Sequence, residues 1–175
     1  MSVKRVSRRT KKVVPPILRY RTKRQTKFRV TQVRNGSFEN SSFSPWRPVG
    51  NVSLARVRPH TGRANARYSV LPGQSASLTQ TLSLSPFRSY RLTFFAESPS
   101  STGILRVRLL GSTFSGGVLN LISIPSGRYQ SYSLTIPAAS LLGRSVFNLE
   151  FQVTGTGTGS QLSVLNLDTV SMVSI

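Results

Sequence analysis

The chain has 175 residues, no cysteine, one histidine and four acidic residues against 24 Lys and Arg, which gives a net charge of +20. Without cysteine there is no disulfide and no thiolate site, and one histidine nearly excludes a zinc site. So few acids also leave few pairs for general acid–base catalysis. We therefore expect no catalytic residues, no cofactor and a partner that is anionic.

The positive charge is concentrated at the N-terminus. Residues 1–34 hold thirteen of the 24 Lys and Arg and no acid. Like charges repel and Pro15-Pro16 interrupts a helix, so residues 1–27 are predicted to be an extended, flexible arm. Apolar residues in its second half favour docking on the sheet edge of a neighbouring subunit, and a solvated tail is the alternative. The residues assigned to this assembly arm are Lys4, Arg5, Arg8, Arg9, Lys11, Lys12, Ile17, Leu18, Tyr20, Phe28 and Val30.

The arm does not resemble an export signal. Its apolar stretch at residues 13–18 is short and interrupted by two prolines, and no segment approaches the ~18 apolar residues of a membrane span. We expect synthesis in the cytosol and no membrane insertion. The predicted division is an arm over residues 1–34 and a domain over residues 35–175.

From Asn35 onward the pattern is all-β. Leu105, Val107 and Leu109 alternate with Arg106 and Arg108, which is typical of a strand with one buried face. Short strands separated by Gly/Pro turns predict a two-sheet antiparallel β-sandwich, a jelly roll, preceded by the arm. The predicted strands are Val52–Val57, Ala66–Val70, Ser75–Leu82, Tyr90–Glu97, Ile104–Leu110, Val118–Ile124, Tyr129–Ile136, Val146–Val153 and Gln161–Val173.

A further strand is expected to begin at Asn35–Glu39, paired with Leu165–Val173. This pairing would bring Glu39 close to Asp168. Two carboxylates completed by backbone carbonyls would suit a structural Ca²⁺. The alternative is that Glu39 pairs with an arginine or caps a turn, while Asp168 accepts from backbone amides.

Three aromatic residues are candidates for a ligand face. Trp46, Tyr68 and Tyr129 would stack on sugar rings if they are exposed, and they are core residues if they are not. Four arginines, Arg56, Arg58, Arg63 and Arg67, cluster across two predicted strands and their connection. Arginine suits bidentate contact with carboxylate or phosphate; a solvated face and a subunit interface are the other interpretations.

Five motifs together resemble carbohydrate-binding-module-like jelly rolls. They are Asn35–Glu39 with the following Trp46, the His-x-Gly-x-x-Ala element His60–Ala66, Leu78–Gln80, Tyr90–Ala96 and Leu167–Val173. Within that group the chain is most similar to the domains of spore-surface proteins, of the exosporium or coat, in endospore-forming bacteria. Those proteins share the turn seen here at Ile124–Arg128. The resemblance implies deposition on the spore surface or a spore-associated body.

Three functions follow from these features. The first is a structural, self-assembling protein of a spore envelope, whose arm ties neighbouring subunits or an acidic co-assembling protein or other polyanion together. The second is a capsid-like protein that packages nucleic acid through the arm. The third is a carbohydrate-binding module whose partner is a glycan.

Overall fold

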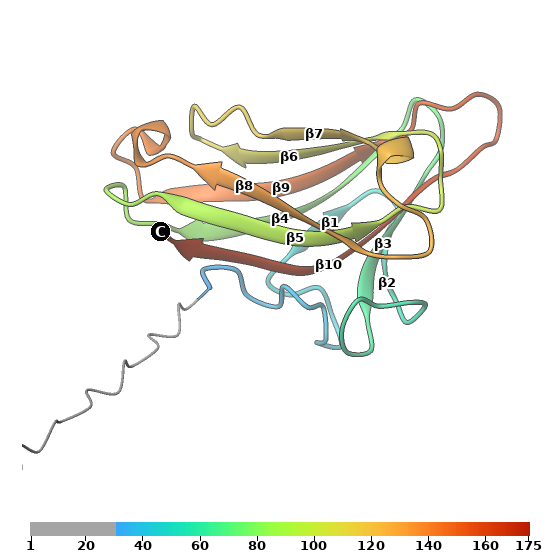
Figure 1. Cartoon of the computed structure of the whole chain (residues 1–175), viewed down its shortest axis with the longest axis horizontal. Helices are drawn as coiled ribbons and strands as arrows, with labels where there is room; N and C mark the ends of the chain where they lie inside the picture. The colour runs from blue at the N-terminus through green and yellow to red at the C-terminus, as the bar shows by residue number, and fades with distance from the viewer. Residues whose placement is uncertain (1–30) are drawn as a thin grey trace, which may run out of the picture.

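The computed structural model describes residues 31–175, which form two five-stranded antiparallel sheets packed face to face (Figure 1). The first sheet runs in the order β1 (Arg47–Val49), β4 (Ser75–Ser83), β9 (Val146–Thr154), β6 (Ile104–Leu110) and β7 (Gly117–Asn120). The second runs in the order β2 (Val52–Ala55), β3 (Asn65–Val70), β10 (Ser163–Ser174), β5 (Tyr90–Glu97) and β8 (Gln130–Ile136). The predicted all-β, two-sheet sandwich is confirmed.

The core lies between the sheets and is filled mainly by alternate side chains of the longer strands. In β6, Leu105, Val107 and Leu109 are buried while the arginines between them are partly exposed. Across the core, the ring of Phe94 in β5 meets the ring of Phe151 in β9 edge-on, with centroids 5.2 Å apart. Each such large apolar side chain contributes roughly 1.5–3 kcal/mol when it is fully buried, so the two inner faces hold the sheets together.

The predicted strands differ from the structure in several places, and the strand predicted over Val52–Val57 ends at Ala55. Strand β1 was not predicted, because its three residues are all exposed and show no alternation. The strand predicted over Val118–Ile124 ends at Asn120 and continues as a 3-10 helix, Leu121–Ser123, because Leu121 turns inward and its N–H donates to the carbonyl of Gly103 (2.9 Å). A second 3-10 helix spans Ala138–Leu141. Among residues 31–175, no helix has the length and apolar character needed to span a membrane.

The segment before β1 is not a strand, so the predicted strand at Asn35–Glu39 is wrong. Asn35 (φ 47°) and Phe38 (φ 58°) both have left-handed backbone conformations, which turn the chain instead of extending it. Phe38 nevertheless enters the core, where its ring lies 5.9 Å from that of Trp46. Phe38 is therefore a buried core residue that belongs to a turn. Its apolar side chain does not mark a strand.

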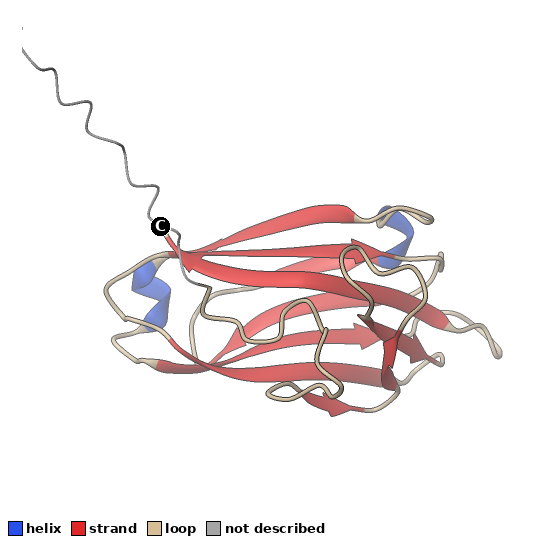
Figure 2. Cartoon of the chain, turned by 90° about the horizontal axis from the view of Figure 1, so that it is seen from below, coloured by secondary structure: helices blue, strands red, loops and turns tan. Residues whose placement is uncertain are grey.

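Residues 31–36 lie beside the C-terminal half of β10. The N–H of Gln32 donates to the carbonyl of Met172 (2.7 Å), and the N–H of Val170 donates to the carbonyl of Gly36 (2.8 Å). From the other sheet, the buried side-chain amide of Gln80 bonds both the N–H and the carbonyl of Arg34, each at 2.8 Å. Figure 2 draws this segment as a loop. Residues 31–36 therefore form hydrogen bonds both to β10 of the second sheet and to β4 of the first sheet.

The assembly-arm residues, Lys4 to Val30, lie outside the described residues, as does the predicted arm up to residue 30. The division into an arm and a domain stays a prediction.

Candidate functional site

A buried carboxylate holds the middle of the loop of residues 56–64, which joins β2 to β3. Asp168 in β10 is fully buried, and its Oδ2 accepts from the N–H groups of His60 (2.8 Å) and Thr61 (3.1 Å). Its Oδ1 accepts from the N–H of Thr169 (2.6 Å). Burial raises the pKa of Asp168, and these N–H donors, that of Thr61 first, oppose the rise. Asp168 therefore anchors the loop to the sheet.

A second carboxylate fixes the end of the same loop. Glu39 Oε1 accepts from the N–H groups of Arg63 (2.8 Å) and Ala64 (3.0 Å), and these bonds lower the pKa of Glu39. Gly62 has a left-handed φ of 68°, and a Cβ there would collide with the Glu39 carboxylate. The left-handed backbone and the position of the Glu39 carboxylate both favour glycine here, which gives the His-x-Gly element a physical reason.

The predicted calcium ligands, Glu39 and Asp168, thus bind successive parts of one loop. Their oxygens face backbone N–H groups, which is the alternative role expected from the sequence. Residues 31–175 contain no group of three or more His, Cys, Asp or Glu that could hold a metal ion. Calcium binding by these two side chains stays a prediction.

The chain's single histidine lies in an aromatic cluster on the outer face of the second sheet. The ring of His60 stacks on Phe95 at 3.8 Å and lies 5.4 Å from Tyr129. Its Nδ1 is 3.2 Å from the hydroxyl of Thr169, and the Asn65 amide donates to the Tyr129 hydroxyl oxygen (3.0 Å). Burial is the main cause that raises the pKa of Tyr129, so its hydroxyl stays protonated. The imidazole bonds a hydroxyl and not a carboxylate, so it forms no acid–base pair of the kind that catalysis by a triad requires.

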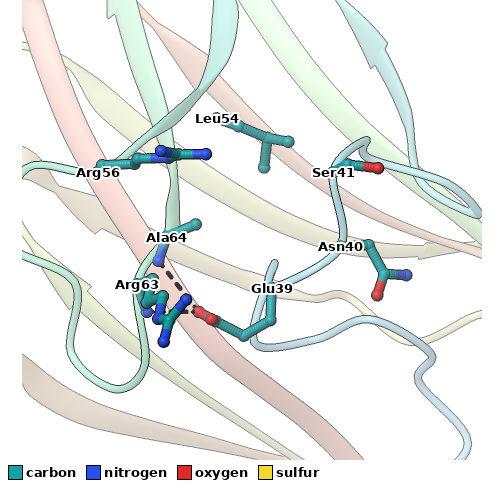
Figure 3. A pocket seen from close by; sticks show the side chains of 7 residues that line it. All are labelled: Glu39, Asn40, Ser41, Leu54, Arg56, Arg63 and Ala64. Atoms are coloured by element: carbon teal, nitrogen blue, oxygen red, sulfur yellow. Dashed lines mark hydrogen bonds between the residues drawn. The ribbon is translucent and has the colours of Figure 1, made fainter.

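Next to this loop lies an open pocket of about 400 Å³ (Figure 3). It is formed by the segment that follows Phe38, by the end of β2 and by the end of the loop. Its lining residues are Glu39, Asn40, Ser41, Leu54, Arg56, Arg63 and Ala64. The volume falls within the range of roughly 300–1,000 Å³ typical of small-ligand sites. The polar lining combines a carboxylate, an amide, a hydroxyl and two guanidinium groups.

The four clustered arginines divide into two pairs. Arg58 lies 3.6 Å from the Glu97 carboxylate, and Arg67 donates to a side-chain amide oxygen in β10. Arg56 and Arg63 line the pocket, and neither forms a salt bridge within residues 31–175. Two of the four arginines, Arg56 and Arg63, therefore lie at the open pocket.

The predicted ligand face is wrong for two of its three residues. Trp46 is 3% exposed and its indole Nε1 donates to the carbonyl of Asn35 (3.1 Å); Tyr68 is fully buried and its hydroxyl donates to the carbonyl of Phe151 (3.2 Å). Both side chains are amphipathic and satisfy their polar atom inside the core. Tyr129 is half-buried in the His60 cluster.

The pocket contains residues that the sequence did not single out. Asn40 and Ser41 follow Glu39 in a polar stretch with no periodicity. They reach the arginines only because Glu39 bonds the loop before β3. The arginine cluster was the one signal in the sequence that pointed toward this region.

A search of solved structures places the fold among carbohydrate-binding modules. TmCBM61 in complex with beta-1,4-galactotriose matches with a TM-score of 0.60 at 18% identity, over 83% of this chain and 99% of that chain. Family 16 Carbohydrate Binding Module-2 matches with a TM-score of 0.57 at 17% identity, over 82% and 99%. The CBM22-1 xylan-binding domain from Paenibacillus barcinonensis Xyn10C matches with a TM-score of 0.56 at 10% identity, over 80% and 92%.

At these identities the likeness shows a shared fold, so the chain has a carbohydrate-binding-module-like jelly roll. No protein-family model and no curated protein matches the chain. The resemblance to spore-surface domains stays a prediction.

Proposed function

We propose that the domain is a non-catalytic glycan-binding module whose ligand occupies the pocket beside Glu39. One observation carries the proposal: a sandwich that matches carbohydrate-binding modules over nearly their whole length holds a polar pocket of about 400 Å³. Two carboxylates hold the middle and the end of the loop in place, so the pocket is largely preformed.

The pocket offers the groups that sugar hydroxyls need. The amide of Asn40 and the hydroxyl of Ser41 both donate and accept, whereas the guanidinium groups only donate. Leu54 and Ala64 supply an apolar surface for the C–H face of a sugar ring. Binding of this kind positions a glycan and changes no covalent bond.

A bulky side chain in the pocket tests the proposal. Ser41→Trp fills the pocket from an exposed position, and Ser101→Trp adds the same ring to an exposed loop elsewhere. Affinity electrophoresis in neutral β-1,4-galactan and in xylan, the ligand types named for the structural neighbours, measures retardation of the full chain. We expect the wild type and Ser101→Trp to be retarded and Ser41→Trp to migrate freely. Equal retardation of all three proteins would place the ligand elsewhere.

A second proposed function is structural: assembly on a spore surface through the basic arm. It is supported by the fixed position of residues 31–36, which lie against β10 and β4 directly after thirty residues with twelve Lys and Arg and no acid. An arm that starts from a fixed point has a defined reach toward a neighbouring subunit or polyanion.

Electron microscopy tests this assembly role. Nuclease-treated full-length protein is compared with protein that lacks residues 1–27. Ordered sheets or fibres from the full-length chain alone are expected. Particles from both that become ordered only when nucleic acid is added back would favour packaging instead.

A further inference from the structure

We propose that the pocket selects a glycan residue that carries a carboxylate, as in a uronic acid, and that Arg56 and Arg63 hold this group. The inference rests on the proposed glycan-binding function and names the chemistry of its ligand. It follows from the charges around the pocket and from how each of them is partnered.

Every carboxylate of the described residues already has partners. Asp168 and Glu39 accept backbone N–H groups, and Glu97 and Glu150 each form a salt bridge with an arginine outside the pocket lining. Residues 35–175 contain eleven arginines and only these four acids. Of these four acids only Glu39 lines the pocket, and it forms no salt bridge with either pocket arginine.

The pocket itself carries a net positive charge. Arg56 and Arg63 supply two positive charges, and Glu39 is the single acid of the lining. The Glu39 carboxylate holds the N–H groups of Arg63 and Ala64 and forms no salt bridge within residues 31–175. An anionic group that enters the pocket meets two guanidinium groups that form no salt bridge with any other residue of 31–175.

The arginines and the neutral polar residues lie on different sides of the pocket. In Figure 3, Arg56 reaches into the pocket from the end of β2, while Asn40 and Ser41 lie on the opposite segment. A ring between them would place its carboxylate on a guanidinium fork, which binds carboxylates with two parallel hydrogen bonds. Its hydroxyls would face the amide and hydroxyl of Asn40 and Ser41.

The lining favours a sugar acid over a nucleic acid. None of the seven lining residues is aromatic, so the pocket lacks the aromatic rings on which successive nucleobases stack in single-strand binding proteins. The neutral hydrogen-bonding groups match ring hydroxyls, which a phosphodiester backbone presents only sparsely. We assign the pocket to uronate-containing glycans for this reason.

Calorimetry with small oligosaccharides tests the inference on the full chain. The probes are trigalacturonate, which carries carboxylates, and β-1,4-galactotriose, which is neutral. Arg56→Gln/Arg63→Gln removes the two pocket charges, and Arg88→Gln/Arg144→Gln removes two exposed charges outside the pocket lining, so both variants have the same net charge. We expect the pocket variant to bind trigalacturonate about tenfold more weakly or worse, the Arg88→Gln/Arg144→Gln control to keep wild-type affinity, and galactotriose to bind more weakly than trigalacturonate.

Three results would overturn the inference, and they differ in what they say of the proposed function. Equal affinity for both probes, unchanged by Arg56→Gln/Arg63→Gln, would leave a neutral glycan site and refute the selection of carboxylates. An equal loss in both variants would show that diffuse positive charge, not the pocket, attracts the ligand. Binding of neither probe, with no polysaccharide retarding the wild type, would remove the glycan-binding function itself.

Discussion

Replacing Asp168 by Asn tests whether one buried carboxylate holds the loop that forms the pocket. Asp168 accepts two N–H groups on Oδ2 and one on Oδ1. An amide keeps only one acceptor oxygen, so whichever way it turns, its NH₂ faces backbone donors. Hydrogen bonds to charged groups contribute about 1.5–3 kcal/mol each, and relief of the buried charge offsets part of that loss.

We therefore expect Asp168→Asn to lower the free energy of unfolding by about 3 kcal/mol, which corresponds to a fall in Tm of about 6–12 °C for a domain of this size. The fluorescence of Trp46, the only tryptophan, reports thermal unfolding because its ring is packed in the core. Hydrogen exchange at the amides of His60 and Thr61 should accelerate in the variant. Asn120→Asp, at an exposed position of β7, is the control and should change stability by less than about 0.5 kcal/mol.

The fall in Tm should be the same with and without EDTA, because the lost partners are N–H groups. A Tm within about 1 °C of wild type would refute the hydrogen-bond argument. So would a wild-type protein whose Tm falls in EDTA to that of Asp168→Asn. That second result would assign a bound Ca²⁺ to Glu39 and Asp168, as the sequence predicts.

Three further substitutions test the same region and the core. The pKa of Glu39 is lowered from 4.5 by the N–H groups of Arg63 and Ala64, so its stabilisation is present above that value and is lost as pH falls through the lower folded pKa. The Tm gap between wild type and Glu39→Gln should therefore be present at neutral pH and close in acid; a gap independent of pH would contradict this. Gly62→Ala adds a Cβ against the Glu39 carboxylate at a left-handed residue, and should cost about 1–3 kcal/mol and weaken glycan binding in affinity electrophoresis. Gly143→Ala is the control: Gly143 is also left-handed (φ 70°), but a Cβ there meets nothing within 4 Å, so the variant should show the backbone cost and keep glycan binding. Tyr68→Phe leaves the carbonyl of Phe151 without its hydroxyl donor and should lower stability by about 1 kcal/mol in a urea titration; an unchanged midpoint would show that this bond contributes nothing.

The sequence predicted the strands well where one face of a strand is buried. In β4, β5, β6 and β9 the alternation of apolar and polar residues marks the inner side, since successive side chains point to opposite faces. It missed β1, which is exposed along its whole length, and it mistook the turn at Phe38 for a strand. An apolar residue in an alternating pattern indicates a buried side chain, but it does not show that the backbone is extended. Phe38 is buried although its backbone is left-handed.

The candidate site was harder to predict because its parts come together only through long-range contacts. The sequence predicted that Glu39 and Asp168 lie close together, and the structure shows that both bond the loop of residues 56–64. It also singled out Arg56 and Arg63 as members of an arginine cluster. Which arginines remain unpaired depends on the positions of Glu97 and Asn166, which lie far away in the sequence. The exposure of Trp46 and Tyr68 was equally undetermined, since either ring can stack on a ligand or fill a core.

The sequence by itself therefore determined the fold class, because a period of two and frequent turn residues admit few architectures other than a sandwich. It also determined the strong positive charge and the scarcity of groups for acid–base chemistry. Only the tertiary structure decided where the loop of residues 56–64 lies and which guanidinium groups face the open pocket. The physical reason is that a backbone N–H or a guanidinium takes its partner from whatever the packing of distant strands brings within about 3 Å.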